Sequence, residues 1–329
     1  HLSRIFAGLY SELLRCFSWN VSSYHRLFVI LHNSNLYMVK SATTIDQQLE
    51  LLRSRGLTVN DADKAREILL DIGYYRLGFY LFPFERSYPE LRNRTHEYIK
   101  GASFEDAVNL YYFDFDLRLL LMRYLNRIEI AFRTSLIYNL SNKYNSNPIW
   151  FVSPAVVNRL YAREFESKVY TSDFKRNPII HRHHQNNPND RFAPAWKTLE
   201  FMTFGAVMKL YEQLKDPDDK IFVAHEFGIR QVVTFENYMH TIRQVRNVCA
   251  HGLLLYDMRL TRRINRGPAR QTPQESGNIV GALRVIKYIM GQVSANRAAE
   301  LSNSICSLYK RLCIQSPNLK PLIPDLSTI

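Results

Sequence analysis

The sequence predicts an all-α fold, and three observations support this prediction. Apolar residues recur at steps of three and four along most of the chain after residue 44, as they do on one face of an α-helix. No series of alternating segments indicates strands, and no internal repeat is visible. Gly and Pro number only 12 and 13 among 329 residues, so helix breakers are sparse.

The first predicted elements are two short helices and a connector. An apolar stripe that begins at Ile45 ends at Gly56, a residue type that suits a helix C-terminus. A second helix is predicted from about Asn60 to Ile72. Residues 73–84 are dense in aromatic side chains but contain two Gly and a Pro, which predicts a packed connector without helical periodicity.

A long amphipathic helix is predicted next. Ser103 and Asp106 have the spacing of a capping box at its start, and residues 145–148 end it. Its apolar positions repeat at helical spacing, and two acid–arginine pairs lie four residues apart on it. The apolar positions are Leu110, Phe113, Leu117, Leu121, Tyr124, Ile128 and Phe132. The pairs are Asp114 with Arg118 and Glu129 with Arg133.

The second half of the chain is predicted to hold one polar loop and five further helices. The loop spans residues 177–194 and contains His181, His183 and His184. No Cys, Asp or Glu completes a spaced ligand set with them, so we expect an exposed loop and no metal site. The helices are predicted at about residues 195–214, 218–227, 232–255, 278–293 and 295–314.

The charge balance favours polyanionic partners. Lys and Arg exceed Asp and Glu by 43 to 30, which gives a formal charge of +13. Nucleic acid is the first partner to consider, although an anionic membrane surface or an acidic protein fits the same charge. No apolar run approaches the roughly 20 residues that span a bilayer. The four Cys show no paired spacing, so we expect reduced thiols and a cytoplasmic protein without a membrane partner.

The helix predicted at residues 232–255 carries the candidate catalytic residues Arg246, Asn247 and His251. Asn247 and His251 lie four apart and share a face, and Arg246 can reach the same ligand. A histidine can move protons near neutral pH, and an arginine can stabilise charge on a phosphorane. By spacing alone, an ordinary solvated surface is the more common explanation. A single His would also require a second copy of the chain to supply both acid and base.

A basic stretch follows this helix and is predicted to bind RNA. Next to a histidine that handles phosphate, its arginines would contact the RNA backbone, although a solvated basic face would need no partner. Tyr256 could stack on an unpaired base. The predicted RNA-binding residues are Arg243, Tyr256, Arg259, Arg262, Arg263 and Arg266.

Several segments, taken in order, resemble the AbiD/AbiF-like abortive-infection family of the HEPN superfamily. The last of them resembles that superfamily's ribonuclease motif, an Arg followed by a His after four to six residues. The segments are residues 44–57, 73–77 leading to 83–84, 127–133, 194–196 with 199–205, and 243–251.

The resemblance implies a HEPN-like helical bundle with additional helices, and a homodimer that brings two motifs together. It implies a metal-independent endoribonuclease without a cofactor, with RNA as substrate. It also implies a toxin in phage defence, restrained by a protein antitoxin or a non-coding RNA. Carried over by position, Arg246, Asn247 and His251 are catalytic, and Glu129 or Arg133 could support them. An acid–arginine pair at this spacing is, however, more often only an ion pair on a helix surface.

We therefore expect three parts and keep one alternative function. Residues 1–40 are an N-terminal appendage of unknown role, residues 41–270 the Abi-like domain, and residues 271–329 C-terminal helices with a Pro-containing tail. Leu253 stands where some HEPN toxins carry a Tyr that a partner enzyme modifies, so regulation by that route is not predicted. The alternative is a non-catalytic RNA-binding or protein-interaction module, which would need the basic surface but not His251.

Overall fold

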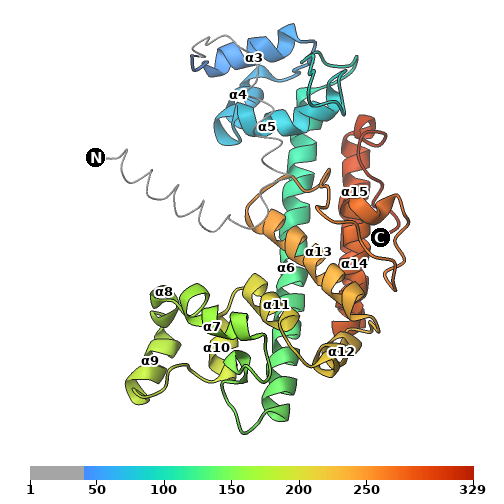
Figure 1. Ribbon diagram of the computed structural model, residues 1–329. Coiled ribbons are helices and arrows are strands. Elements are labelled where there is room, and N and C mark those ends of the chain that lie inside the picture. Colours follow the sequence, from blue (N-terminus) through green and yellow to red (C-terminus); the bar gives the residue numbers. More distant parts are fainter. Residues whose placement is uncertain (1–40) are drawn as a thin grey trace. The chain divides into compact units, whose positions relative to one another are not determined.

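The computed structural model describes residues 41–329, and helices are the only extended secondary structure within them (Figure 1). Four isolated β-bridges occur in that range, but no strand. The predicted all-α class is confirmed. The predicted appendage, residues 1–40, lies outside the described residues. The chain divides into two compact units, one up to Val108 and one from Asn109 to Ile329.

The first unit contains three short helices and one 3₁₀ turn. They are α3 (Ile45–Ser54), α4 (Ala62–Asp71), α5 (Tyr74–Leu81) and η1 (Phe82–Phe84). Helix α3 ends as predicted, because Gly56 takes the left-handed φ of 90° that follows a helix C-terminus. The connector predicted at residues 73–84 is wrong. Residues 74–81 form helix α5, whose buried residues are Leu77, Tyr80 and Leu81, and Pro83 lies early in η1, where no backbone N–H is needed.

Helix α6 (Phe104–Lys143) is the longest element and continues from the first unit into the second. The hydroxyl of Ser103 accepts a hydrogen bond from the backbone N–H of Asp106 at 3.0 Å, as the capping pattern predicts. The helix ends before residues 145–148, also as predicted.

The second unit holds the remaining elements. They are η2 (Trp150–Val152), α7 (Arg159–Lys168), α8 (Ser172–Lys175), α9 (Pro178–Asn186), α10 (Ala195–Phe201), α11 (Phe204–Glu212), α12 (Pro217–Glu226), α13 (Val232–Ala250), η3 (Glu275–Gly277), α14 (Ile279–Val293), α15 (Ala295–Gln315) and η4 (Pro317–Leu319). Helices α7 and α8 were not predicted from the sequence. The single helix predicted at residues 195–214 is divided into α10 and α11, which separate at Thr203 because its side chain caps α11 through the N–H of Ala206.

The polar loop predicted at residues 177–194 contains helix α9, so that prediction is wrong in part. Asn177 caps the helix, and Pro178 occupies its first turn. His183 is buried, and the ring of His184 hydrogen-bonds through Nε2 to the hydroxyl of Tyr170 at 2.9 Å. Two of the three histidines are therefore packing residues, and only the remainder of the segment is a loop.

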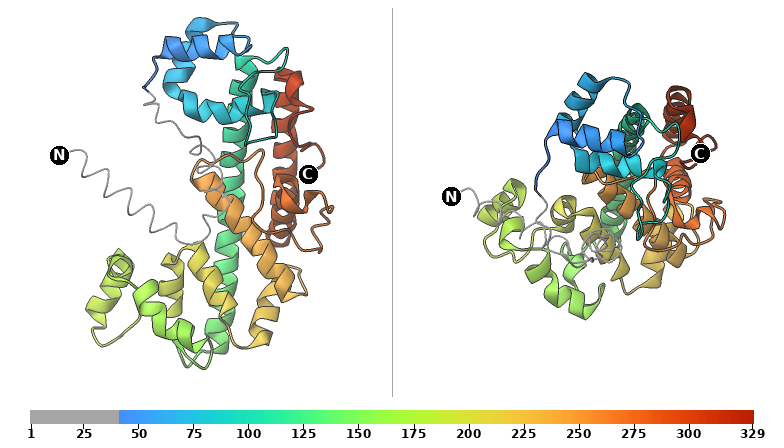
Figure 2. Two further views of the ribbon diagram at one scale, coloured as in Figure 1. Left: turned by 45° about the horizontal axis from the view of Figure 1, so that its top comes forward. Right: turned by 90° about the horizontal axis from the view of Figure 1, so that it is seen from above.

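The core of the second unit forms where α6 meets α11, α12 and α13. The ring of Phe132 lies 5.7 to 6.4 Å from those of Phe204, Tyr211, Phe227 and Phe235. Figure 2 shows α13 crossing α6 at an angle, with the α14–α15 pair beside them. No helix among residues 41–329 is both long and apolar enough to cross a lipid bilayer.

Candidate active site

The candidate catalytic residues occupy the C-terminal end of α13. Gly252 has a φ of 62°, which places it in the left-handed region that follows many helices. The N–H of Leu253 bonds to the carbonyl of Val248 at 3.0 Å, and that of Gly252 to Cys249 at 3.3 Å. This pair of bonds ends α13 at Ala250, with the exposed His251 as its C-cap residue, so the helix stops before the predicted residue 255.

Glu129 on α6 links the predicted supporting pair to the predicted catalytic arginine. One carboxylate oxygen lies 3.0 Å from Nη2 of Arg133, and the other lies 3.7 Å from Nε of Arg246. Arg133 also donates to the carbonyl of Met202 at 3.0 Å. Nη1 of Arg246 donates to Oδ1 of Asn247 at 3.5 Å. The structure thus brings together four of the five predicted catalytic and supporting residues.

The aromatic core explains why these side chains meet. Phe132 is three residues after Glu129 on α6, and its ring lies 5.9 Å from that of Phe235 on α13. Arg246 follows Phe235 by eleven residues, which is about three helical turns, so both project from one face of α13. The face of α13 that packs on α6 through Phe235 therefore also carries Arg246, which contacts Glu129.

A second acid–arginine pair of α6 holds the chain that follows His251. Asp114 and Arg118 form an ion pair, with side chains 0% and 5% exposed. Asp114 accepts backbone hydrogen bonds from Leu255 at 3.2 Å and Tyr256 at 2.6 Å. Arg118 donates to the carbonyl of Leu253 at 3.1 Å. Leu253, Leu254 and Leu255, which follow the motif, thus belong to a segment that is bound to α6.

The buried Cys249 lies between the candidate residues on the core side of α13. Burial raises the pKa of its thiol to about 12, with a further contribution from Asp114. Such burial is typical of a structural cysteine. Within residues 41–329, no group of three or more His, Cys, Asp or Glu side chains could hold a metal ion.

A family model described as "Abi-like protein" matches residues 67–257, which is more than half of the chain. The match includes both ion pairs of α6 and the whole of α13. The chain belongs to the Abi-like protein family. No curated protein and no solved structure matches it. The family assignment agrees with the resemblance inferred from the ordered segments.

The predicted RNA-binding residues of this Abi-like chain occupy different environments. Arg243 is half-buried, and burial lowers the pKa of its guanidinium, although the carboxylate of Glu212 raises it. Tyr256 is only 3% exposed. Its side chain therefore packs inside the chain in this structure, and stacking on a base stays a prediction. The remaining four are exposed: Arg259, Arg262, Arg263 and Arg266.

Two features of this Abi-like chain escaped the sequence analysis. Asp114 and Arg118 were recognised as a pair along the helix, but their contacts with residues 253–256 were not predicted. Glu212 and His240, on α11 and α13, are joined at 2.8 Å between Oε1 and Nε2. A charged pair on an otherwise apolar face of α6 is the signal that could have indicated the first contact.

Proposed function

We propose that this Abi-like protein is a metal-independent endoribonuclease that acts as a toxin in abortive infection, the anti-phage response for which its family is named. The contact of Glu129 with both Arg133 and Arg246 is the observation that carries the proposal. It orients a guanidinium beside Asn247, one turn before an exposed His251. An oriented cation next to a histidine suits stabilisation of a phosphorane during RNA cleavage.

The reaction needs one proton acceptor and one proton donor. His251 takes the proton of the 2′-hydroxyl while that oxygen attacks the phosphorus, and the bond from phosphorus to the 5′-oxygen breaks. The partner subunit's His251 gives a proton to the leaving 5′-oxygen. The products are a 2′,3′-cyclic phosphate and a 5′-hydroxyl, and Arg246 stabilises the charge on the phosphoryl oxygens between these steps.

A homodimer would supply the second histidine, and an apolar surface near the motif supports it. Phe115 and Leu119 on α6 are 41% and 59% exposed, and Leu253 is 36% exposed. Arg118, which binds the carbonyl of Leu253, lies between Phe115 and Leu119 in the sequence. The contact of Arg118 places this part of α6 beside the end of α13, and a second copy could cover the exposed apolar side chains there. A protein antitoxin or a non-coding RNA would hold such a toxin in check.

The test is cleavage of single-stranded RNA by the purified chain in EDTA. We expect cleavage with cyclic phosphate ends, and a loss of at least about 100-fold in His251→Ala. His225→Ala is the matched control, because His225 is an exposed histidine on α12 outside the candidate site. Equal cleavage by His251→Ala would contradict the catalytic assignment. An absence of cleavage by every variant would favour a non-catalytic binding module instead.

Expression in cells provides a second readout. We expect the chain to arrest growth and Arg246→Ala to relieve the arrest, because the guanidinium stabilises the transition state. Growth arrest that persists in Arg246→Ala, at an equal protein level, would point away from toxicity by RNA cleavage.

A further inference from the structure

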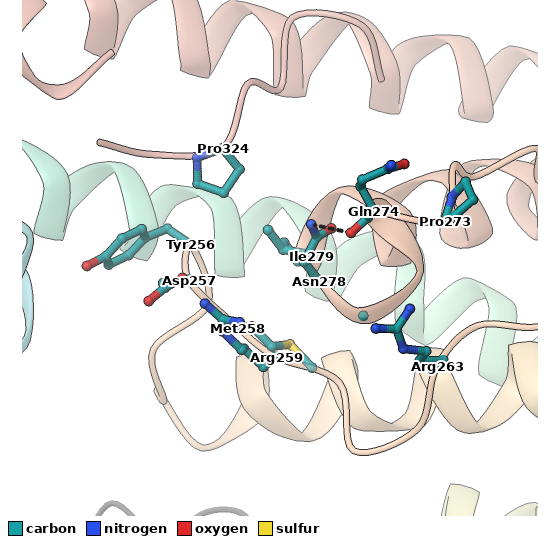
Figure 3. Close-up of a pocket in the computed structure, with 11 residues that line it drawn as sticks. Tyr256, Asp257, Met258, Arg259, Arg263, Pro273, Gln274, Asn278, Ile279 and Pro324 are labelled. Carbon is teal, nitrogen blue, oxygen red and sulfur yellow. Dashed lines mark hydrogen bonds between the residues drawn. The ribbon is translucent and has the colours of Figure 1, made fainter. Parts of the chain in front are cut away.

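A pocket of about 530 Å³ lies in the segment that follows α13, between residues 256–263 and the turn at residues 273–279 (Figure 3). Its volume falls within the range of about 300 to 1,000 Å³ that is common for small-molecule sites. The family match ends at Asp257, so most of this pocket lies beyond it. Nothing in the proposed cleavage chemistry uses the pocket.

At one end of the pocket, the carboxylate of Asp257 can accept hydrogen bonds, but no described residue donates one to it. Figure 3 shows Asp257 and Arg259 at this end, with Arg263 and Gln274 at the other. Asp257 is half-buried, and no described residue forms a hydrogen bond or an ion pair with its carboxylate. Burial raises the pKa of this carboxyl, while Arg259 lowers it. A ligand that donates hydrogen bonds would satisfy it.

The two arginines supply donors at both ends. Both are exposed, and neither forms an ion pair with any residue of the described range 41–329. Among the described residues, the side chain of Arg263 hydrogen-bonds only to Ser276, from Nη1 to the hydroxyl at 3.5 Å. Guanidinium groups bind phosphate and the acceptor edges of bases in bidentate geometry. The pocket therefore combines one acceptor with two sets of donors.

We infer that this pocket binds one guanine nucleotide, either free or within an RNA strand. Guanine is the base that matches the end with Asp257 and Arg259. Its N1–H and N2–H groups can donate to the carboxylate, while O6 and N7 accept from the guanidinium. Arg263 at the opposite end then binds the phosphate. Adenine presents an amino group where guanine has O6, so it would face the donors of Arg259 with another donor.

The pocket can bind a free nucleotide whether or not the chain cleaves RNA. It can select a guanosine of the RNA substrate only if the chain is a nuclease, so this second role rests on the proposed function. In that role, the pocket would hold a nucleotide of the strand that is cleaved at His251, since only residues 252–255 separate His251 from Tyr256, which lines the pocket. The proposed nuclease would then prefer RNA with a guanosine at one fixed position beside the cleavage site.

Calorimetric titration of the full chain with GMP, AMP, CMP and UMP tests the proposal. We expect GMP to bind at least about tenfold more tightly than the others, since a site that hydrogen-bonds one base rejects analogues that leave its groups unpaired. Asp257→Asn should weaken GMP binding by about tenfold or more, because the amide cannot accept from both N–H groups. Asp218→Asn, an exposed change on α12, is the control.

A comparison of GMP with guanosine tests the second contact. Arg263→Ala should weaken GMP by about tenfold and leave guanosine unchanged, because guanosine lacks the phosphate. Arg230→Ala removes an exposed arginine elsewhere and should change neither. Equal binding of all four nucleotides, or no binding of GMP at millimolar concentration, would overturn the inference.

Cleavage assays separate this failure from a failure of the proposed function. Suppose that RNA cleavage depends on His251 but shows no preference for guanosine, and that GMP does not bind. This result would contradict only the proposal that the pocket binds guanine nucleotides. Selective binding of GMP by a chain that cleaves no RNA would support the nucleotide-binding pocket and contradict only the proposed nuclease activity.

Discussion

Helix α6 carries two acid–arginine pairs with the same spacing, and they do different things. Asp114 and Arg118 are almost fully buried and bind the backbone that leaves α13. Glu129 and Arg133 retain 12% and 11% of their side-chain exposure, and Glu129 lies 3.7 Å from a third charged residue, Arg246. The first pair faces backbone groups, and the second faces a catalytic candidate.

Two acid–arginine pairs with the same four-residue spacing can therefore have different roles. A fully buried carboxylate that accepts backbone hydrogen bonds fixes a chain path, and its loss would leave the buried guanidinium uncompensated. A carboxylate that is shared by two guanidinium groups contributes less to folding where solvent reaches one of them, as it reaches the 35% exposed Arg246. It does, however, determine where Arg246 is held. The first pair is therefore structural, and the second is a positioning device for the proposed reaction.

Asp114→Ala should have the largest effect on stability. It leaves Arg118 without its carboxylate and the N–H groups of Leu255 and Tyr256 without their acceptor, at a cost of about 3 to 5 kcal/mol. Urea unfolding measures this loss. Asp116→Ala is the control on the same helix, because Asp116 is 41% exposed and pairs with an exposed Arg311. That control should cost less than about 1 kcal/mol, and equal losses would refute the structural role of Asp114.

Glu129→Gln should have a smaller effect on stability and a clear effect on activity. The amide keeps the size of the side chain but removes the charge that faces Arg133 and Arg246, at a cost of about 1 to 2 kcal/mol. We expect kcat for RNA cleavage to fall by about tenfold with little change in KM, because Arg246 acts in the transition state. Unchanged kcat would remove Glu129 from the site and leave it as a structural residue.

The coupling between Glu129 and Arg246 can be measured by a double-mutant cycle. The two groups lie 3.7 Å apart, and Arg246 is 35% exposed, so we expect a coupling energy of only about 0.5 to 1 kcal/mol in unfolding. The coupling should decrease at high salt, because solvent reaches the pair. A coupling of several kcal/mol would show that the pair is as structural as Asp114 with Arg118.

Leu253→Glu should change stability least. Its side chain is 36% exposed, and its carbonyl bond to Arg118 is kept, so we expect a change within about 0.5 kcal/mol. The new charge should nevertheless prevent the proposed dimer, as sedimentation equilibrium can measure. Leu160→Glu alters a leucine that is 51% exposed on α7 and should leave the dimer intact. A Leu253→Glu variant that remains dimeric would place the dimer contact elsewhere.

The all-α fold class and most helix ends could be predicted from local signals in the sequence. Ser103 begins α6 and Gly56 follows α3 where their capping chemistry indicates, because caps act within one turn of the chain. Residues 73–84 were misread because their aromatic density hides the periodicity of a helix that is buried on one side. Residues 177–194 were misread because polar side chains such as His184 find partners only after folding.

By itself, the sequence determined the all-α class, the family and the identity of the candidate residues at the end of α13. Those properties depend on local periodicity, on helix capping and on an ordered set of motifs, all of which are visible in the sequence. Only the tertiary structure decided that Glu129 contacts Arg246, that Asp114 holds the leucines after His251, and that Tyr256 is buried. Each depends on how α13 packs across α6. That geometry is fixed by side chains more than 100 residues apart, which no local pattern in the sequence records.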